Sequence, residues 1–146
     1  MRGIVGVAAL VAFASCSRSR ALPKKWKVSA SFGAGLCAET ATDACNTSWE
    51  VAETGPIHVT DHFRAGPKTR DIVLTADDRN ALERALRSAR FWDGMDSDNP
   101  CPGEVHDLWI HLSFENVDSG SSKSHNITPC EDDHFAKDVT RLLMRR

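Results

Sequence analysis

The sequence predicts an α+β fold, in which a mainly antiparallel sheet of about five to six strands carries two helices. Two patterns in its 146 residues indicate this fold. Several short segments alternate apolar and polar residues with a period of two, which is typical of half-buried strands joined by tight turns. Two other segments, at about residues 75–90 and 131–144, space their apolar residues as one face of a helix does. Runs of strands that stand apart from the helices favour antiparallel pairing, with the helices on one face.

The first strand is expected at residues 27–32, where Val28, Ala30 and Phe32 share one face and polar residues occupy the other. Residues 57–63 alternate in the same way, so they predict a second half-buried strand. Further strands are expected at residues 47–53, 71–75, 108–114 and 124–129.

Two expectations concern how these strands are placed. The unbroken apolar run within residues 71–75 favours a central strand. The polar, serine-rich residues 116–123 favour a flexible connector. His111 and His125 would then face each other across the hairpin around that connector.

The clearest helix covers residues 75–90. Thr75 suits the N-cap, an aspartate follows three residues later as in a capping box, and arginines lie near the end, where the helix dipole favours bases. Phe91 and Trp92 follow and are expected to close over the core. Residues 131–144 have the same layout, with acids first, an apolar stripe next and arginines last.

Composition and motifs exclude several classes of function. The net charge of −2 gives no overall field that would favour nucleic acid. The sequence contains no nucleophile elbow, phosphate-binding loop or zinc-protease helix, so no enzyme class is indicated. His58 and His62 would lie about 13 Å apart along a strand, too far to share one metal ion. Neither a metal nor a cofactor is therefore expected.

The first fifteen residues have the layout of a secretory signal. Arg2 supplies a positive charge, residues 3–14 form an apolar stretch too short to span a bilayer, and small residues follow. Cleavage by a general signal peptidase after Ala14 is one possibility, which would leave Cys16 as an odd thiol in an oxidising compartment.

The other possibility rests on the sequence Phe-Ala-Ser-Cys at residues 13–16, which resembles the lipobox of bacterial lipoproteins. Phe13 stands where that family usually has leucine. The resemblance implies that Cys16 carries a diacylglyceryl group with fatty acyl chains such as palmitate and becomes the first mature residue. Residues 16–25 would then form a lipidated, basic tether, and residues 26–146 a single globular domain. Ser17 after the cysteine resembles the pattern that routes such proteins to the outer membrane.

Apart from Cys16, the chain has four cysteines, Cys37, Cys45, Cys101 and Cys130. Because export places them where disulfides persist, we expect them to form two structural disulfides. Three connectivities are possible, and we favour Cys37–Cys45 and Cys101–Cys130.

Together these features predict a membrane-tethered, extracytoplasmic binding or inhibitory module without catalytic activity. Its location would be the cell envelope, on the outer membrane and facing the periplasm or the surface. A structural envelope lipoprotein and a small hydrolase with an unrecognised site are the alternatives. The expected partners are the membrane, through the lipid anchor, and a protein.

A binding site for that partner is expected in the loop that follows the first helix, at residues 91–103. Its candidate residues are Trp92, Met95, Asp96 and Asp98, because aromatic and methionine side chains are enriched at the cores of interfaces. The alternative interpretation is that the aromatic residues belong to the core and the loop has no such role.

Overall fold

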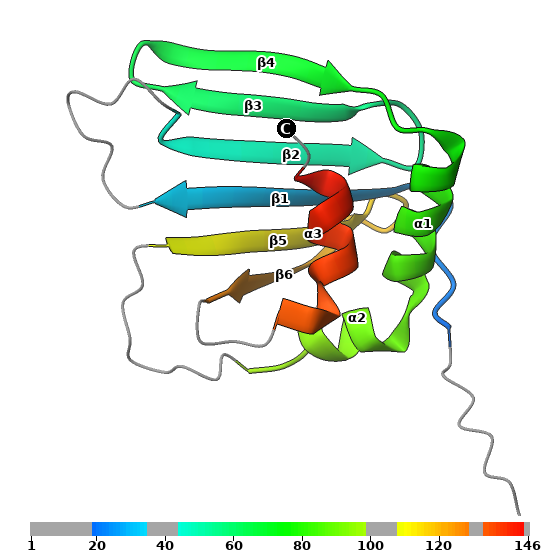
Figure 1. Ribbon diagram of the computed structural model, residues 1–146. Coiled ribbons are helices and arrows are strands. Elements are labelled where there is room, and N and C mark those ends of the chain that lie inside the picture. The colour runs from blue at the N-terminus through cyan, green and yellow to red at the C-terminus, as the bar shows by residue number, and fades with distance from the viewer. Residues whose placement is uncertain (1–18, 35–43, 99–107, 129–132, 145–146) are drawn as a thin grey trace, which may run out of the picture.

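The computed structural model describes residues 19–34, 44–98, 108–128 and 133–144. Six strands form one sheet in the order β4-β3-β2-β1-β5-β6, and each neighbouring pair is antiparallel (Figure 1). The elements are β1 (Trp26–Ala34), β2 (Asn46–Ala52), β3 (Ile57–Phe63), β4 (Gly66–Ile72), α1 (Ala76–Arg87), α2 (Ala89–Met95), β5 (Leu108–Asn116), β6 (Ser121–Ile127), the 3-10 turn η1 (Asp133–Phe135) and α3 (Lys137–Leu143). The predicted α+β class with an antiparallel sheet is confirmed.

The core lies between the sheet and the helices, which gather on one face of it (Figure 1). Val28 in β1 pairs with Val51 in β2 and Phe114 in β5, and all three side chains are buried. The next residue of β1, Ser29, pairs with polar residues of the same two strands. The period-two pattern therefore separates a face that packs against the helices from a polar face.

The predicted helix at 75–90 ends earlier than expected. Thr75 is the N-cap, as predicted, and its side chain accepts a hydrogen bond from the Asp78 amide. Ser88 has an extended backbone and separates α1 from α2. Its hydroxyl donates to the Ala85 carbonyl and accepts from the Phe91 amide, so one residue caps both helices.

The prediction of a central strand at residues 71–75 is wrong. β4 ends at Ile72 and forms an edge of the sheet, and Val73 beyond it is 84% exposed. The polar residues of β4 pair with β3 through their backbones, which requires no apolar alternation. The predicted connector at residues 116–123 is likewise partly a strand, since β6 begins at Ser121.

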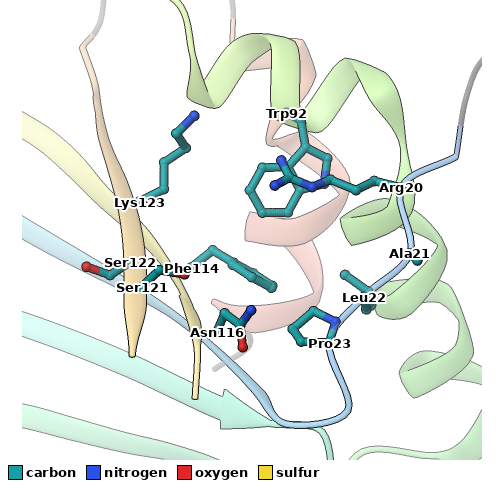
Figure 2. Close-up of a pocket in the computed structure, with 10 residues that line it drawn as sticks. All are labelled: Arg20, Ala21, Leu22, Pro23, Trp92, Phe114, Asn116, Ser121, Ser122 and Lys123. Atoms are coloured by element: carbon teal, nitrogen blue, oxygen red, sulfur yellow. The ribbon is translucent and has the colours of Figure 1, made fainter. Parts of the chain in front are cut away.

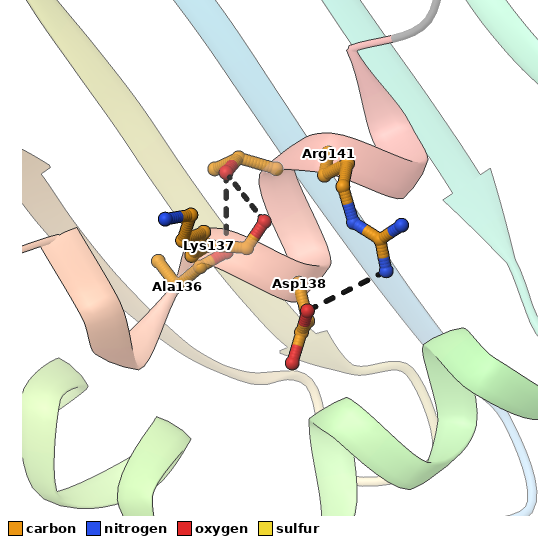
Figure 3. Close-up of polar contacts among 5 residues, drawn as sticks. Ala136, Lys137, Asp138 and Arg141 are labelled. Carbon is orange, nitrogen blue, oxygen red and sulfur yellow. Dashed lines mark hydrogen bonds and ion pairs between the residues drawn. The ribbon is translucent and has the colours of Figure 1, made fainter.

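The C-terminal helix is shorter than predicted. Within the described part of residues 131–144, η1 precedes α3, whose Val139, Leu142 and Leu143 are buried as expected. No side chain caps α3 at Ala136. The Thr140 hydroxyl, one turn later, donates back to the carbonyls of Ala136 and Lys137, a contact within the helix that leaves the first amides uncapped by side chains (Figure 3).

Residues 19–25 lie along the domain, and we call them the strap. The Arg20 amide donates to the Arg87 carbonyl at the end of α1, over 2.8 Å. Leu22 packs against the core, and the Lys25 carbonyl accepts from the Val117 amide at 3.1 Å. Much of the segment that the sequence suggests as a tether therefore contacts the folded chain.

Candidate functional site

A cavity of about 390 Å³ lies between the strap, α2 and the β5–β6 hairpin (Figure 2). We call it the strap cavity. Arg20, Ala21, Leu22 and Pro23 line it from the strap, Trp92 from α2, and Phe114, Asn116, Ser121, Ser122 and Lys123 from the hairpin. Its volume falls within the range of small-ligand sites, which begins at about 300 Å³.

The apolar wall of the strap cavity is held rigidly. The Trp92 indole N–H donates to the Leu86 carbonyl at 2.8 Å, which fixes the ring against α1. Its ring meets that of Phe114 edge to face, with centroids 4.9 Å apart. Because both side chains are buried and mutually packed, the wall is formed before any ligand arrives.

Two cations flank this wall. The Arg20 guanidinium lies 4.1 Å from the centre of the Trp92 ring, a cation–π contact that Figure 2 shows from the side of the strap. Lys123, on the hairpin, forms an ion pair with Asp96 beyond the end of α2. Hydroxyls of Ser121 and Ser122 and the Asn116 amide complete the polar lining. An apolar wall beside two cations suits a ligand that joins an apolar group to a carboxylate.

The structure places the four predicted binding residues in different environments. Trp92 and Met95 are only 8% and 3% exposed. For Trp92 this burial agrees with the alternative interpretation, in which the aromatic residues belong to the core. Asp96 and Asp98 are exposed. Of the four, only Trp92 lines the strap cavity. Asp96 lies outside the lining but pairs with Lys123, which belongs to it. Of the predicted loop, residues 91–95 belong to α2, and residues 99–103 lie outside the described residues.

The structure also corrects the expected histidine pair. His111 opposes Asn126, and its Nδ1 lies 2.6 Å from the Asn126 side-chain oxygen. His125 opposes Leu112 and lies on the buried side of the sheet, where its ring contacts Phe135. The two histidines therefore point to opposite faces. Among the described residues, no group of three or more histidine, cysteine or acidic side chains is placed to hold a metal ion.

Most of the predicted cysteine sites fall outside the described residues, namely Cys16, Cys37, Cys101 and Cys130. Cys45 is described, and its amide donates to the His62 carbonyl at 3.0 Å. The disulfide connectivity and the lipidation of Cys16 therefore stay predictions.

Sequence reasoning missed the strap and the hairpin residues of the cavity. Leu22, the apolar residue beside Pro23 in an otherwise basic segment, was a signal for the strap, because it packs against the core. Lys123 gave no signal, since its strand is polar on most positions.

No family model, curated protein or solved structure matches this chain. In the part of the chain that the structure describes, no helix has the length and apolar character needed to span a membrane.

Proposed function

We propose that the protein is a lipid-anchored, extracytoplasmic binding module whose strap cavity receives a segment of a protein partner. One observation supports this proposal: the strap, which begins three residues after the predicted anchor at Cys16, forms one side of the strap cavity. A partner bound there would be held close to the membrane that carries the anchor. No catalytic step is part of the proposal.

The lining residues define the chemistry of the partner segment. An apolar side chain would pack against the small exposed parts of Trp92 and Phe114, whose rings are held rigidly against each other. A carboxylate on the same segment would pair with Arg20, or it would replace Asp96 as the ion-pair partner of Lys123. A segment in which an aliphatic or aromatic residue lies beside an acidic residue or a C-terminal carboxylate therefore fits best.

The anchor is tested on the full chain. Mass spectrometry of the protein purified from membranes should find acyl chains on Cys16, and Cys16→Ser should release the protein or leave it unprocessed. Two or more acyl chains hold a protein firmly, at about 0.8 kcal/mol per buried methylene group. An unmodified Cys16 would refute the anchor.

The strap cavity is tested by position-specific crosslinking in intact envelopes. A photo-reactive benzoylphenylalanine at Ser121, in the cavity, should capture one discrete partner, whereas the same group at Thr69 in β4, at the far edge of the sheet, should not. Combining Arg20→Ala with Lys123→Ala should weaken capture at least about tenfold, since each charged hydrogen bond contributes about 1.5–3 kcal/mol. Arg64→Ala combined with Lys68→Ala, which removes the same two charges at exposed positions far from the cavity, is the matched control. Equal capture at both positions would favour a structural envelope lipoprotein instead.

A further inference from the structure

Four arginines gather where the end of α1 meets α2 and α3, and we call this the arginine surface. Arg84, Arg87 and Arg90 line a hollow of about 480 Å³ together with Ser19 of the strap and Asp93. Arg84 and Arg90 also line a second hollow of about 400 Å³, which includes Arg141 of α3. Since the hollows share two arginines, they form one continuous surface.

Among the described residues, two of the four arginines have no carboxylate partner. Arg87 pairs with Glu83 at 3.3 Å, and Arg141 pairs with Asp138 at 3.5 Å, a contact that Figure 3 shows. Arg84 and Arg90 form no ion pair within the described part of the chain, and both are exposed. The shared centre of the arginine surface therefore presents two free guanidinium groups, which suit bidentate binding of phosphate.

The strap fixes where this surface lies relative to the anchor. The hydrogen bond from the Arg20 amide to the Arg87 carbonyl holds the strap at the end of α1, and Ser19 lines the first hollow. Cys16 precedes Ser19 by three residues, which span about 11 Å at most when fully extended. Acyl chains on Cys16 would therefore bring Ser19 and the arginines beside it into the range of the lipid headgroups, since the Debye length is about 8 Å at physiological salt.

We propose that the arginine surface docks on anionic phospholipid headgroups and holds the domain against the bilayer. This inference rests on the proposed anchor at Cys16. The observations that carry it are the short reach from Cys16 and the two unpaired arginines at the centre of the surface. Each basic residue at an anionic surface strengthens docking roughly fivefold, so Arg84 and Arg90 together contribute roughly 25-fold.

The test uses the full mature protein, purified with its lipid, in vesicles of phosphatidylcholine with and without phosphatidylglycerol. Phenylglyoxal, which modifies accessible arginines, is applied, and the modified residues are mapped by mass spectrometry. In the anionic vesicles, modification of Arg84 and Arg90 should slow severalfold and recover at about 1 M salt, where the Debye length falls to about 3 Å. Arg64, at the β3–β4 turn on the far end of the sheet, should react equally in both vesicles (Figure 1).

A double variant tests the same surface. Combining Arg84→Gln with Arg90→Gln should abolish the protection of Arg87 in anionic vesicles, whereas Arg64→Gln with Lys68→Gln, which removes the same charge elsewhere, should preserve it. Equal modification of Arg84 and Arg90 in both vesicles, or protection that salt does not reverse, would overturn the inference. If the purified protein lacks the acyl group, only the anchor is refuted. Anionic vesicles added to this protein should still protect Arg84 and Arg90 if the arginine surface binds phospholipid headgroups.

Discussion

Gly94 lies in α2, directly against the ring of Phe135 in η1. A Cβ atom added at Gly94 would overlap the Phe135 side chain. The close approach of α2 and η1 therefore requires a glycine, which has no side chain, at position 94.

Overpacking usually costs about 1–3 kcal/mol, and the helix propensity of alanine offsets about 1 kcal/mol of that cost. Gly94→Ala should therefore lower the free energy of unfolding by up to about 2 kcal/mol. Denaturant unfolding would measure it. In a Phe135→Ala background the cost of Gly94→Ala should shrink, because alanine lacks the Cγ and Cδ2 atoms that the new methyl group would overlap most closely. A stabilised single variant would show that η1 simply moves away.

Local chemistry made some residues predictable and not others. The cap at Thr75 could be predicted because both partners lie within four residues of each other. From the sequence alone, Gly94 suggested a loop. The reason for a glycine at this helical position is its contact with Phe135, which is far away in the sequence. The contact of Arg20 with Trp92 was equally hidden, because nothing in a basic segment indicates which aromatic ring it will meet.

Among the elements, Lys27 links the three central strands on the polar face of the sheet. Its Nζ lies 3.1 Å from a carboxylate oxygen of Glu115 in β5 and 3.5 Å from one of Glu50 in β2. The hydrogen bond to Glu115, and next the charge of Glu50, raise the pKa of Lys27 above its usual 10.5. The charged form is therefore more favourable in the folded protein than in the unfolded chain.

A raised lysine pKa stabilises the fold below the unfolded-state pKa, and this stabilisation is lost as the pH rises through the folded-state pKa. Lys27→Gln should thus lower the free energy of unfolding by up to about 1 kcal/mol at neutral pH, the usual scale for a partly exposed ion pair. The difference from the unsubstituted protein should begin to shrink near pH 10.5 and should disappear only above the raised pKa of Lys27 in the folded protein. Urea unfolding at several pH values measures it. The control is Lys137→Gln, because Lys137 is an exposed lysine of α3 without an ion pair in the described residues; its effect on stability should not depend on pH. A loss of stability from Lys27→Gln that does not change with pH would contradict the prediction.

The elements with one buried face were the ones that the sequence could predict. β1, β2, β3 and β5 alternate apolar and polar residues because the helices cover one side of them. β4 and β6 are edge strands, where backbone pairing with a single neighbour holds a mostly polar segment. The sequence predicted the second half of β6, where His125 and Ile127 are buried, but not its serine-rich start or most of β4. Polar edges discourage pairing with other chains, so the property that protects these segments also removes the signal that would predict them.

For the molecule as a whole, the two predicted disulfides would be the main covalent cross-links. Peptide mapping without reduction should link Cys37 with Cys45 and Cys101 with Cys130, and a peptide that joins Cys45 to Cys101 would contradict this connectivity. By loop-closure entropy, the two bonds contribute about 2.5 and about 3.5 kcal/mol respectively. Replacing Cys101 and Cys130 with serine should therefore cost more stability than replacing Cys37 and Cys45.

The position of β1 in the sheet has a consequence for how the chain matures. β1 pairs with β2, the next strand along the chain, but also with β5, which follows four strands and two helices. If the chain is exported N-terminus first, as proposed above, β1 to β4 can pair as a meander before β5, with Phe114 and its neighbours, reaches the other edge of β1. That edge has unsatisfied backbone groups and invites aggregation. Completion of the sheet is thus a late, non-local step, and the emerging half-sheet is the species that a chaperone in the envelope would need to shield.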